Sequence, residues 1–148
     1  MNCQELEAYL HTNIPITHSM EVSAVSILPD SVTLSAPLAP NKNHRETAFG
    51  GSVSTLAILG AWSFLRIKLG DLAKGTHLVI QRNSMEYLKP INGEFSACAA
   101  LGKGADWARF ERTLKTRGRA RISIGAEVRY CNDVCARFEG EFVALIQK

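Results

Sequence analysis

The residues with the clearest potential for chemistry lie together, in a polar loop and at the start of the apolar segment that follows it. Gly50 and Gly51 begin that segment, and glycine allows a ligand to approach the backbone closely. If the segment is a helix, its first N–H groups are unpaired and its dipole favours negative charge. Such a site stabilises an oxyanion, and one backbone donor there contributes about 3 kcal/mol. The alternative is that the two glycines only form a tight turn.

The loop before the glycines supplies polar side chains. Asn43 has an amide oxygen that can hold an attacking water, although a loop asparagine often bonds only its own backbone. Glu46 is the candidate general base, although a loop glutamate is more often merely solvated. His44 can donate to a carbonyl group, with a surface position as the favoured interpretation.

Ser52 and Thr55 lie in the first turns of the predicted helix. A serine nucleophile is not indicated, because Gly-Ser-Val-Ser-Thr does not match the Gly-x-Ser-x-Gly pattern and no triad order is visible. We expect Ser52 to help satisfy the free N–H groups of the first helical turn.

The pattern along the chain predicts mixed helix and strand. Alternating apolar and polar residues predict six strands, and helical spacing predicts one long buried helix and two short ones. Asn92-Gly93 is a signal for a tight hairpin, and Asn132-Asp133 predicts a tight turn. The expected strands are 19–28, 31–38, 76–89, 94–101, 119–130 and 134–146. The expected helices are 2–11, about 52–69 and 105–116.

The long helix is apolar nearly all round, so it must be covered on most sides. A long antiparallel sheet that curls around one helix covers it in this way. The edge strands of such a sheet favour pairing with a second copy. We therefore expect one α+β domain over residues 1–148, with a sheet of five to six strands around a central helix.

The composition is that of an ordinary globular protein, with 46% apolar residues, 21% charged residues and a net charge of +3. These values exclude a disordered chain and give no support for a nucleic-acid partner. Polar residues interrupt the apolar segment 53–69, which therefore predicts a buried helix and not a membrane span. The first residues do not match a secretory signal, so a cytoplasmic location is expected. The cysteines match no zinc spacing and are expected to be small apolar residues: Cys3, Cys98, Cys131 and Cys135.

Three segments resemble a known family. Residues 43–52 (NHRETAFGGS) resemble the loop and helix start of hotdog-fold thioesterases, where an Asn lies six positions before His-Gly-Gly. Phe49 replaces that His, as in the thioesterase family typified by the C-terminal domain of the bacterial YiiD acetyltransferase. Residues 87–90 (YLKP) resemble the Tyr-x-x-Pro strand end of hotdog proteins, and residues 118–121 and 138–143 resemble their closing hairpin. The resemblance extends from about residue 5 to residue 146.

The resemblance implies a single hotdog domain that hydrolyses an acyl thioester of coenzyme A or of acyl carrier protein, in fatty acid metabolism. In the implied roles, Asn43 positions water, and Gly50 and Gly51 polarise the carbonyl group. The resemblance supplies no base, so Glu46 is chosen from the acids of this sequence, with Glu86 on a later strand as another acid that could reach the site. No metal or other cofactor is expected. The residues expected to contact substrate are His44, Phe49, Ser52, Thr55 and Tyr87.

One departure from the related families leaves other functions open. Those families often carry a catalytic acid nine positions after the His, and Ile58 occupies that place here. A noncatalytic acyl-thioester-binding module is therefore one alternative. A hotdog hydratase or dehydratase is another, although Phe49 in place of the His argues against it.

The expected partners follow from the same family. We expect a homodimer or tetramer, and neither nucleic acid nor a membrane as a partner. Basic residues between positions 103 and 121 suit the phosphates of coenzyme A or an acidic carrier, with ordinary surface charges as the alternative. Four side chains are candidates for the wall of an acyl tunnel, with core packing as the simpler interpretation: Trp62, Phe64, Met85 and Tyr87.

Overall fold

The long apolar segment forms the central helix α3 (Gly50–Leu69) in the computed structural model, which describes residues 1–147. Gly60 lies against the sheet, where an added Cβ would lie 3.7 Å from the Cβ of Ala99 and from the oxygen of Ala97. Residues 50–73 are long and apolar enough to resemble a membrane span by length and composition, but 56% of that apolar window is buried inside the protein. The prediction of a buried core helix is confirmed.

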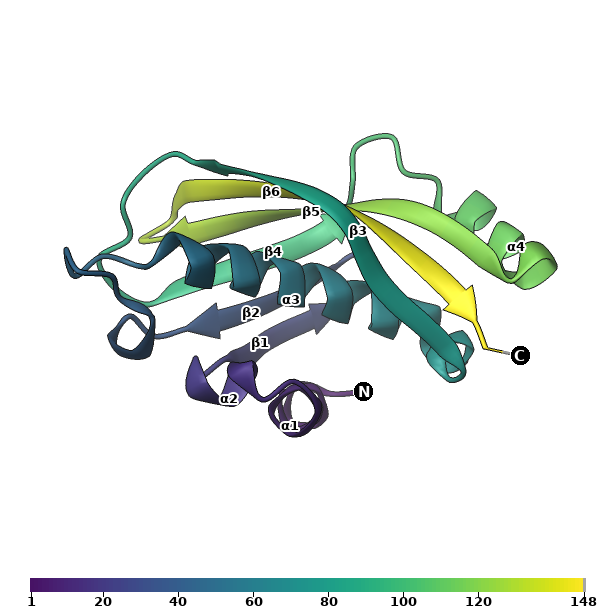
Figure 1. Ribbon diagram of the computed structural model, residues 1–148, viewed down its shortest axis with the longest axis horizontal. Coiled ribbons are helices and arrows are strands. Elements are labelled where there is room, and N and C mark those ends of the chain that lie inside the picture. Colours follow the sequence, from purple (N-terminus) through teal and green to yellow (C-terminus); the bar gives the residue numbers. More distant parts are fainter. Residues whose placement is uncertain (148) are drawn as a thin grey trace.

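The other elements surround this helix. In Figure 1 the strands run along α3, and α1 and α2 lie below β1 in that view. In chain order they are α1 (Cys3–Asn13), α2 (Ile16–Ser19), β1 (Ser23–Leu28), β2 (Ser31–Ala36), η1 (Ala39–Asn41), η2 (Gly70–Ala73), β3 (Thr76–Tyr87), β4 (Phe95–Leu101), α4 (Trp107–Arg117), β5 (Arg119–Tyr130) and β6 (Asp133–Ile146).

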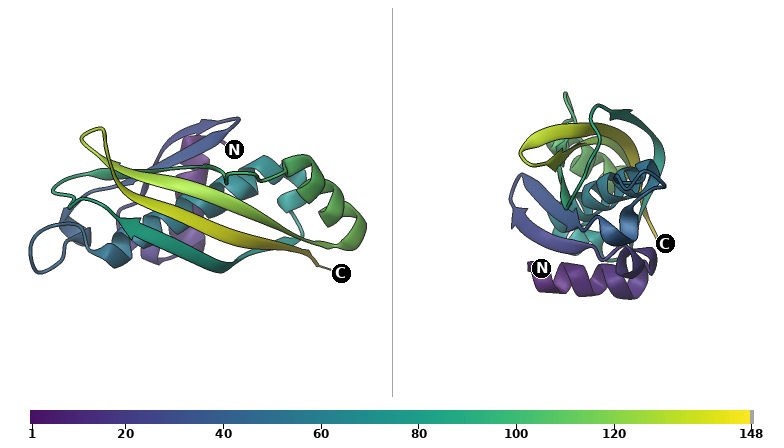
Figure 2. Two further views of the ribbon diagram at one scale, coloured as in Figure 1. Left: turned by 90° about the horizontal axis from the view of Figure 1, so that it is seen from above. Right: turned by 90° about the vertical axis from the view of Figure 1, so that its left-hand side faces the viewer.

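The six strands form one sheet in the order β1-β2-β4-β5-β6-β3, and every neighbouring pair is antiparallel. The end-on view in Figure 2 shows the sheet curling around α3. Alternate residues of each strand therefore face the helix, as Phe138 and Phe142 of β6 do from their buried positions. The predicted α+β architecture is confirmed, with six strands and one long central helix.

Some local predictions were wrong. Asn92-Gly93 does not form a hairpin, because neither residue has the positive φ of a tight hairpin turn, and β3 pairs with β6 instead of β4. A tight turn joins β5 to β6, but its residues with positive φ are Cys131 and Asn132, so it lies one position before the predicted Asn132-Asp133. The first strand begins at Ser23 and not at residue 19, because α2 ends at Ser19 and a turn follows it before the strand.

The two edge strands differ in how they are covered. On β1, the N–H of Ala24 donates to Glu7 of α1 at 3.0 Å, and Nε2 of His11 lies 2.8 Å from the oxygen of Val22 just before the strand. On β3, a helix side chain reaches the strand only at Leu78, whose oxygen accepts from Trp62 at 3.2 Å, among the side-chain bonds of residues 1–147. β1 is thus shielded by α1, while most of β3 is an open edge.

Candidate active site

The start of α3 carries free backbone donors. Within residues 1–147, no side chain caps this helix end. The N–H groups of Ser52 and Val53 donate to the oxygen of Phe49, whereas those of Gly50 and Gly51 have no hydrogen-bond acceptor among residues 1–147. The expected capping by the Ser52 side chain is therefore wrong, because the backbone of Phe49 already supplies the acceptor. Two aligned N–H groups at a helix start favour a developing negative charge.

Two hydrogen bonds fix the backbone that enters the helix. The N–H of Phe49 donates to the oxygen of Asn41 at 2.7 Å, and the N–H of Ala48 donates to that of Ile91 at 2.9 Å. Asn41 is itself buried, and its amide donates to the oxygens of Met20 and Pro37. The position of the two glycines therefore depends on segments that are distant in sequence.

The two glycines have different surroundings. A Cβ at Gly51 would lie 2.3 Å from the ring of Phe49, which is 56% exposed and covers this part of the helix start. The atoms nearest to a Cβ at Gly50 would be those of the Tyr87 ring, at an ordinary 3.6 Å. Close packing thus explains the glycine at position 51 and not the glycine at position 50.

A hollow of about 260 Å³ lies next to Gly50. Tyr87 forms one wall, and its hydroxyl donates to the oxygen of Gly50 at 3.3 Å. Lys89 also lines the hollow and pairs with Asp133 at 3.6 Å. Sequence reasoning missed Lys89 and Cys135, which reach this place from strand ends far from the glycines. The signal for Lys89 was available, since it lies inside the Tyr-x-x-Pro motif.

Asn43 organises the loop before the helix. Its amide oxygen accepts the N–H groups of Arg45 at 2.8 Å and Thr47 at 3.2 Å. Its amide nitrogen donates to the hydroxyl of Thr47 at 2.9 Å. These bonds match the backbone-bonding alternative of the sequence analysis. They also leave the water-positioning role of Asn43 as a prediction.

Glu46 and His44 lie at the exposed tip of this loop. The Glu46 carboxylate pairs with Lys42 at 3.6 Å, and its side chain is 80% exposed. Glu46 also has a φ of 63°, a left-handed conformation that side chains other than glycine seldom adopt. The catalytic role predicted for Glu46 remains a prediction.

The basic residues of α4 and of the start of β5 lie far from Gly50 and Gly51 within one chain. α4 lies near the last turn of α3, where the Lys68 ammonium is 5.1 Å from the ring of Trp107 (Figure 1). α3 extends about 27 Å from Gly50 to this end, at 1.5 Å per residue. The arginines of α4 and early β5 are therefore too distant to contact the part of a ligand that lies at Gly50 of the same chain.

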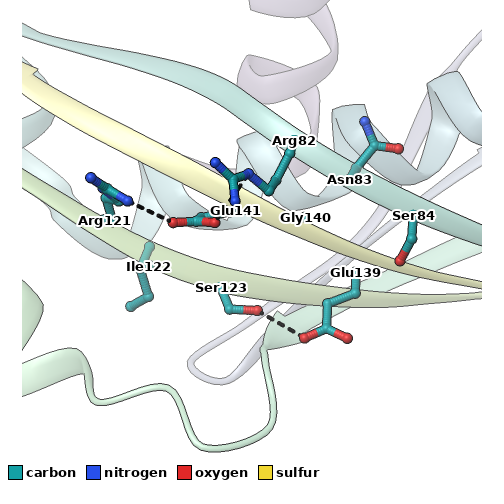
Figure 3. Close-up of a pocket in the computed structure, with 9 residues that line it drawn as sticks. All are labelled: Arg82, Asn83, Ser84, Arg121, Ile122, Ser123, Glu139, Gly140 and Glu141. Atoms are coloured by element: carbon teal, nitrogen blue, oxygen red, sulfur yellow. Dashed lines mark hydrogen bonds and ion pairs between the residues drawn. The ribbon is translucent and has the colours of Figure 1, made fainter.

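A larger hollow than the one beside Gly50, of about 500 Å³, lies on the outer face of the sheet (Figure 3). Glu141 accepts ion pairs there from Arg82 at 3.6 Å and Arg121 at 3.4 Å. The Ser123 hydroxyl donates to Glu139 at 3.3 Å. Glu139 and Glu141 point away from α3, because Phe138 and Phe142, which flank them on β6, are buried on the helix side. The hollow is thus lined by a surface network of ion pairs, on the face of the sheet opposite to α3.

The cysteines and the acids form no metal site within residues 1–147. No group of three or more His, Cys, Asp or Glu side chains is close enough to hold an ion in this part of the chain. Cys135 is buried and Cys3 and Cys98 are half-buried, as small apolar residues are. Cys131 is exposed, contrary to that expectation, because it lies in the turn between β5 and β6.

Comparison with known proteins gives a consistent family. A sequence model of the family described as "Putative thioesterase (yiiD_Cterm)" matches residues 3–146. A protein of unknown function from Chlorobaculum tepidum is 25% identical, with a TM-score of 0.89 over 98% of this chain and 94% of its own. A "putative thioesterase" from Shewanella oneidensis is 24% identical, with a TM-score of 0.84 over 97% and 96%. A thioesterase from Haemophilus influenzae, 13% identical, has a TM-score of 0.80 over 99% and 92%. The two less similar structures support the hotdog fold alone.

Proposed function

The chain belongs to the YiiD C-terminal thioesterase family, and we propose that it hydrolyses an acyl thioester to a free acid and a thiol. The observation that carries the proposal is the pair of N–H groups at Gly50 and Gly51, which have no acceptor among residues 1–147. The family match supplies the reaction class. The free donors supply a place where its transition state is stabilised.

In the proposed mechanism, the thioester carbonyl oxygen lies at the start of α3. Water attacks the carbonyl carbon, the oxygen gains negative charge, and the N–H groups of Gly50 and Gly51 stabilise it. The C–S bond then breaks, and the thiolate leaves and takes up a proton. Tyr87 supports this geometry by holding the oxygen of Gly50 from the strand side.

We propose that residues of the loop before α3 bind the attacking water and accept its proton. Asn43 would hold the water near the helix start, and Glu46 would accept the proton. The ion pair with Lys42 keeps the Glu46 carboxylate next to a positive charge in the present structure. Glu46 would therefore act after the loop tip turns toward the substrate.

The substrate would be an acyl group on coenzyme A or on acyl carrier protein, and the mechanism uses no cofactor. Lys89 lines the hollow beside Gly50, so its ammonium, which pairs with Asp133, is a positive charge at the site for a phosphate or an acidic carrier. The basic surface of α4 would serve the same site only across a subunit interface.

We propose that the protein forms a homodimer through β3. This strand has twelve residues and pairs on one side only, with β6, among the described strands. An antiparallel pair of β3 strands would continue the sheet and place the Thr76 end of one copy beside the Tyr87 end of the other. Edge strands of this length rarely remain unpaired.

A noncatalytic acyl-binding module is the second candidate. Ile58 favours it, since this side chain lies in apolar surroundings with Leu59 and Phe142 and has no proton to exchange. Such a module would bind an acyl thioester and release no thiol. A hydratase would instead add water to an enoyl thioester, again without releasing a thiol.

The deciding experiment is free-thiol release from short, medium, long and aromatic acyl-coenzyme A substrates. We expect turnover of one class, with kcat reduced about 100-fold in Asn43→Ala and in Glu46→Gln. Asn43→Asp keeps an oxygen that accepts from the N–H groups of Arg45 and Thr47 and from a water, so it should retain more of the rate than Asn43→Ala. Asn13→Ala, at the exposed end of α1, is the control and should keep full rate.

Two results would contradict the proposal. Tight binding of an acyl thioester without thiol release, for both coenzyme A and acyl carrier protein, would establish the binding module. Loss of the enoyl double bond with the thioester intact would establish a hydratase.

A further inference from the structure

A second cavity begins one helical turn beyond the two glycines. It has a volume of about 270 Å³ and lies between α3, the connection from α1 to α2, and β3. Its walls are the apolar side chains of Ile14, Ile16, Ile58, Leu59, Ile80 and Phe142, together with Thr55 and Trp62. A cavity with almost no polar lining fits a hydrocarbon and not a sugar, a nucleotide or an ion.

The cavity lies on the same face of α3 as Gly51. Gly51, Thr55, Ile58 and Trp62 follow each other at spacings of four, three and four residues, so they share a face of the helix. The Thr55 hydroxyl donates to the oxygen of Gly51 at 2.7 Å, so its hydrogen atom is already used. From Gly51 to Trp62 the helix rises about 16 Å. A ligand whose carbonyl group lies at Gly51 can therefore extend its apolar part into this cavity.

Trp62 lies at the far end of this face and is held from several sides. Its indole N–H donates to the oxygen of Leu78 on β3 at 3.2 Å. The ring of Tyr9 stacks on it, with centroids 6.0 Å apart and planes 15° apart. The guanidinium carbon of Arg66 lies 4.2 Å from the Tyr9 ring centroid. An indole fixed in this way is a rigid wall, whereas an aliphatic side chain there would adjust to its ligand.

We propose that this cavity holds the distal part of an unsubstituted hydrocarbon acyl chain and that Trp62 limits the length of the chain. The proposal rests on the proposed thioesterase function and adds the substrate class and a residue that determines specificity. The Ile58 side chain then has a positive role, as part of the acyl wall. A carboxylate at that position would be costly to bury among these apolar groups.

The test compares the two tryptophans of the chain. Rates of thiol release would be measured for hexanoyl-, decanoyl- and hexadecanoyl-coenzyme A. In Trp62→Ala, the ratio of kcat/KM for the longest substrate to that for the shortest should rise at least about ten-fold, since each methylene accommodated in an apolar pocket is worth that much or more. Trp107→Ala removes an equal side chain outside the cavity and should leave the ratio unchanged.

Ile58→Phe provides a change in the opposite direction, should Trp62→Ala fold poorly. The larger ring fills the cavity, so the same ratio should fall. Equal loss of rate on every substrate in Trp62→Ala, together with an unchanged ratio in Ile58→Phe, would overturn the proposal and leave Trp62 with a purely structural role.

A binding measurement separates this proposal from the proposed function. In Trp107→Phe, Trp62 is the single remaining tryptophan, and its fluorescence reports on the cavity directly. Titration with decanoate should change this fluorescence with saturation, and Ile58→Phe in the same background should weaken the binding. Saturable binding without thiol release would sink the thioesterase function and keep the cavity assignment. Thiol release without any fluorescence response to decanoate would keep the thioesterase function and overturn the cavity assignment.

Discussion

At the scale of single residues, the start of α3 depends on how Phe49 and Gly51 fit together. The ring of Phe49 occupies the space where a Cβ at position 51 would be, at 2.3 Å. We expect Gly51→Ala to displace either the ring or the first helical turn, and so to misplace the N–H groups. A shift near 1 Å costs about 100-fold in rate, so kcat for thiol release should fall by that order.

The double variant Phe49→Ala/Gly51→Ala is the control for this steric argument. Removing the ring makes room for the new methyl group, so the double variant should be faster than Gly51→Ala alone. Gly50→Ala should be mild by comparison, because the atoms nearest to its Cβ are those of the Tyr87 ring, at 3.6 Å. Full activity of Gly51→Ala would show that thiol release does not depend on the close packing of Phe49 against Gly51.

Prediction from the sequence worked best for residues whose neighbours are local. The glycines and the loop belong to one stretch of chain, so their type and order already placed two donors at a helix start. The bonds of Asn43 with Arg45 and Thr47 were one of two local options that sequence could not rank. Lys89 and Cys135 were missed because their approach to Gly50 depends on how distant strands are ordered.

At the scale of elements, the same distinction holds. Alternation fixes which residues of a strand face the helix, and this depends only on neighbours in the chain. The order of strands does not, and the Asn92-Gly93 signal wrongly paired β3 with β4. The pairing of β4 with β2 and β5 outweighed the turn preference of Asn92-Gly93. In this position both edges of β4 have hydrogen-bonded neighbours.

Two glycines in regular elements give opposite predictions for stability. A Cβ at Gly60 of α3 would make ordinary contacts with Ala97 and Ala99, and alanine is favoured over glycine in a helix by about 1 kcal/mol. Gly60→Ala should therefore raise the melting temperature by about 3 °C in thermal unfolding followed by circular dichroism.

Gly140→Ala on β6 is the matched contrast. Its Cβ would lie 2.5 Å from the ring of Phe138 and 3.1 Å from that of Phe142, and both rings are buried. Overpacking of this kind costs about 1–3 kcal/mol, so the melting temperature should drop. A drop in Gly60→Ala as well would mean that α3 lies closer to β4 than these distances imply.

At the scale of the whole molecule, the asymmetry of the two sheet edges decides how copies associate. Glu7 and His11 of α1 bond backbone groups at and beside β1, so this edge is less available to pair with a strand of a second copy. Among the described side chains, β3 receives a hydrogen bond from a helix side chain only at Leu78. Large exposed apolar side chains also lie on or just beyond β3, namely Val79, Tyr87 and Leu88.

A pair of valine-to-lysine variants tests which edge forms the dimer. Val79 on β3 and Val25 on β1 are 47% and 55% exposed, so neither substitution disturbs the core. Val79→Lys would place two added ammonium groups in the proposed interface, and like charges there cost several kcal/mol. Light scattering over a dilution series should give twice the 16.2 kDa chain mass for the wild type and for Val25→Lys. The dissociation constant should rise at least about 100-fold in Val79→Lys. Dissociation in Val25→Lys instead would assign the interface to β1, and then α1 would have to move away before two copies could pair.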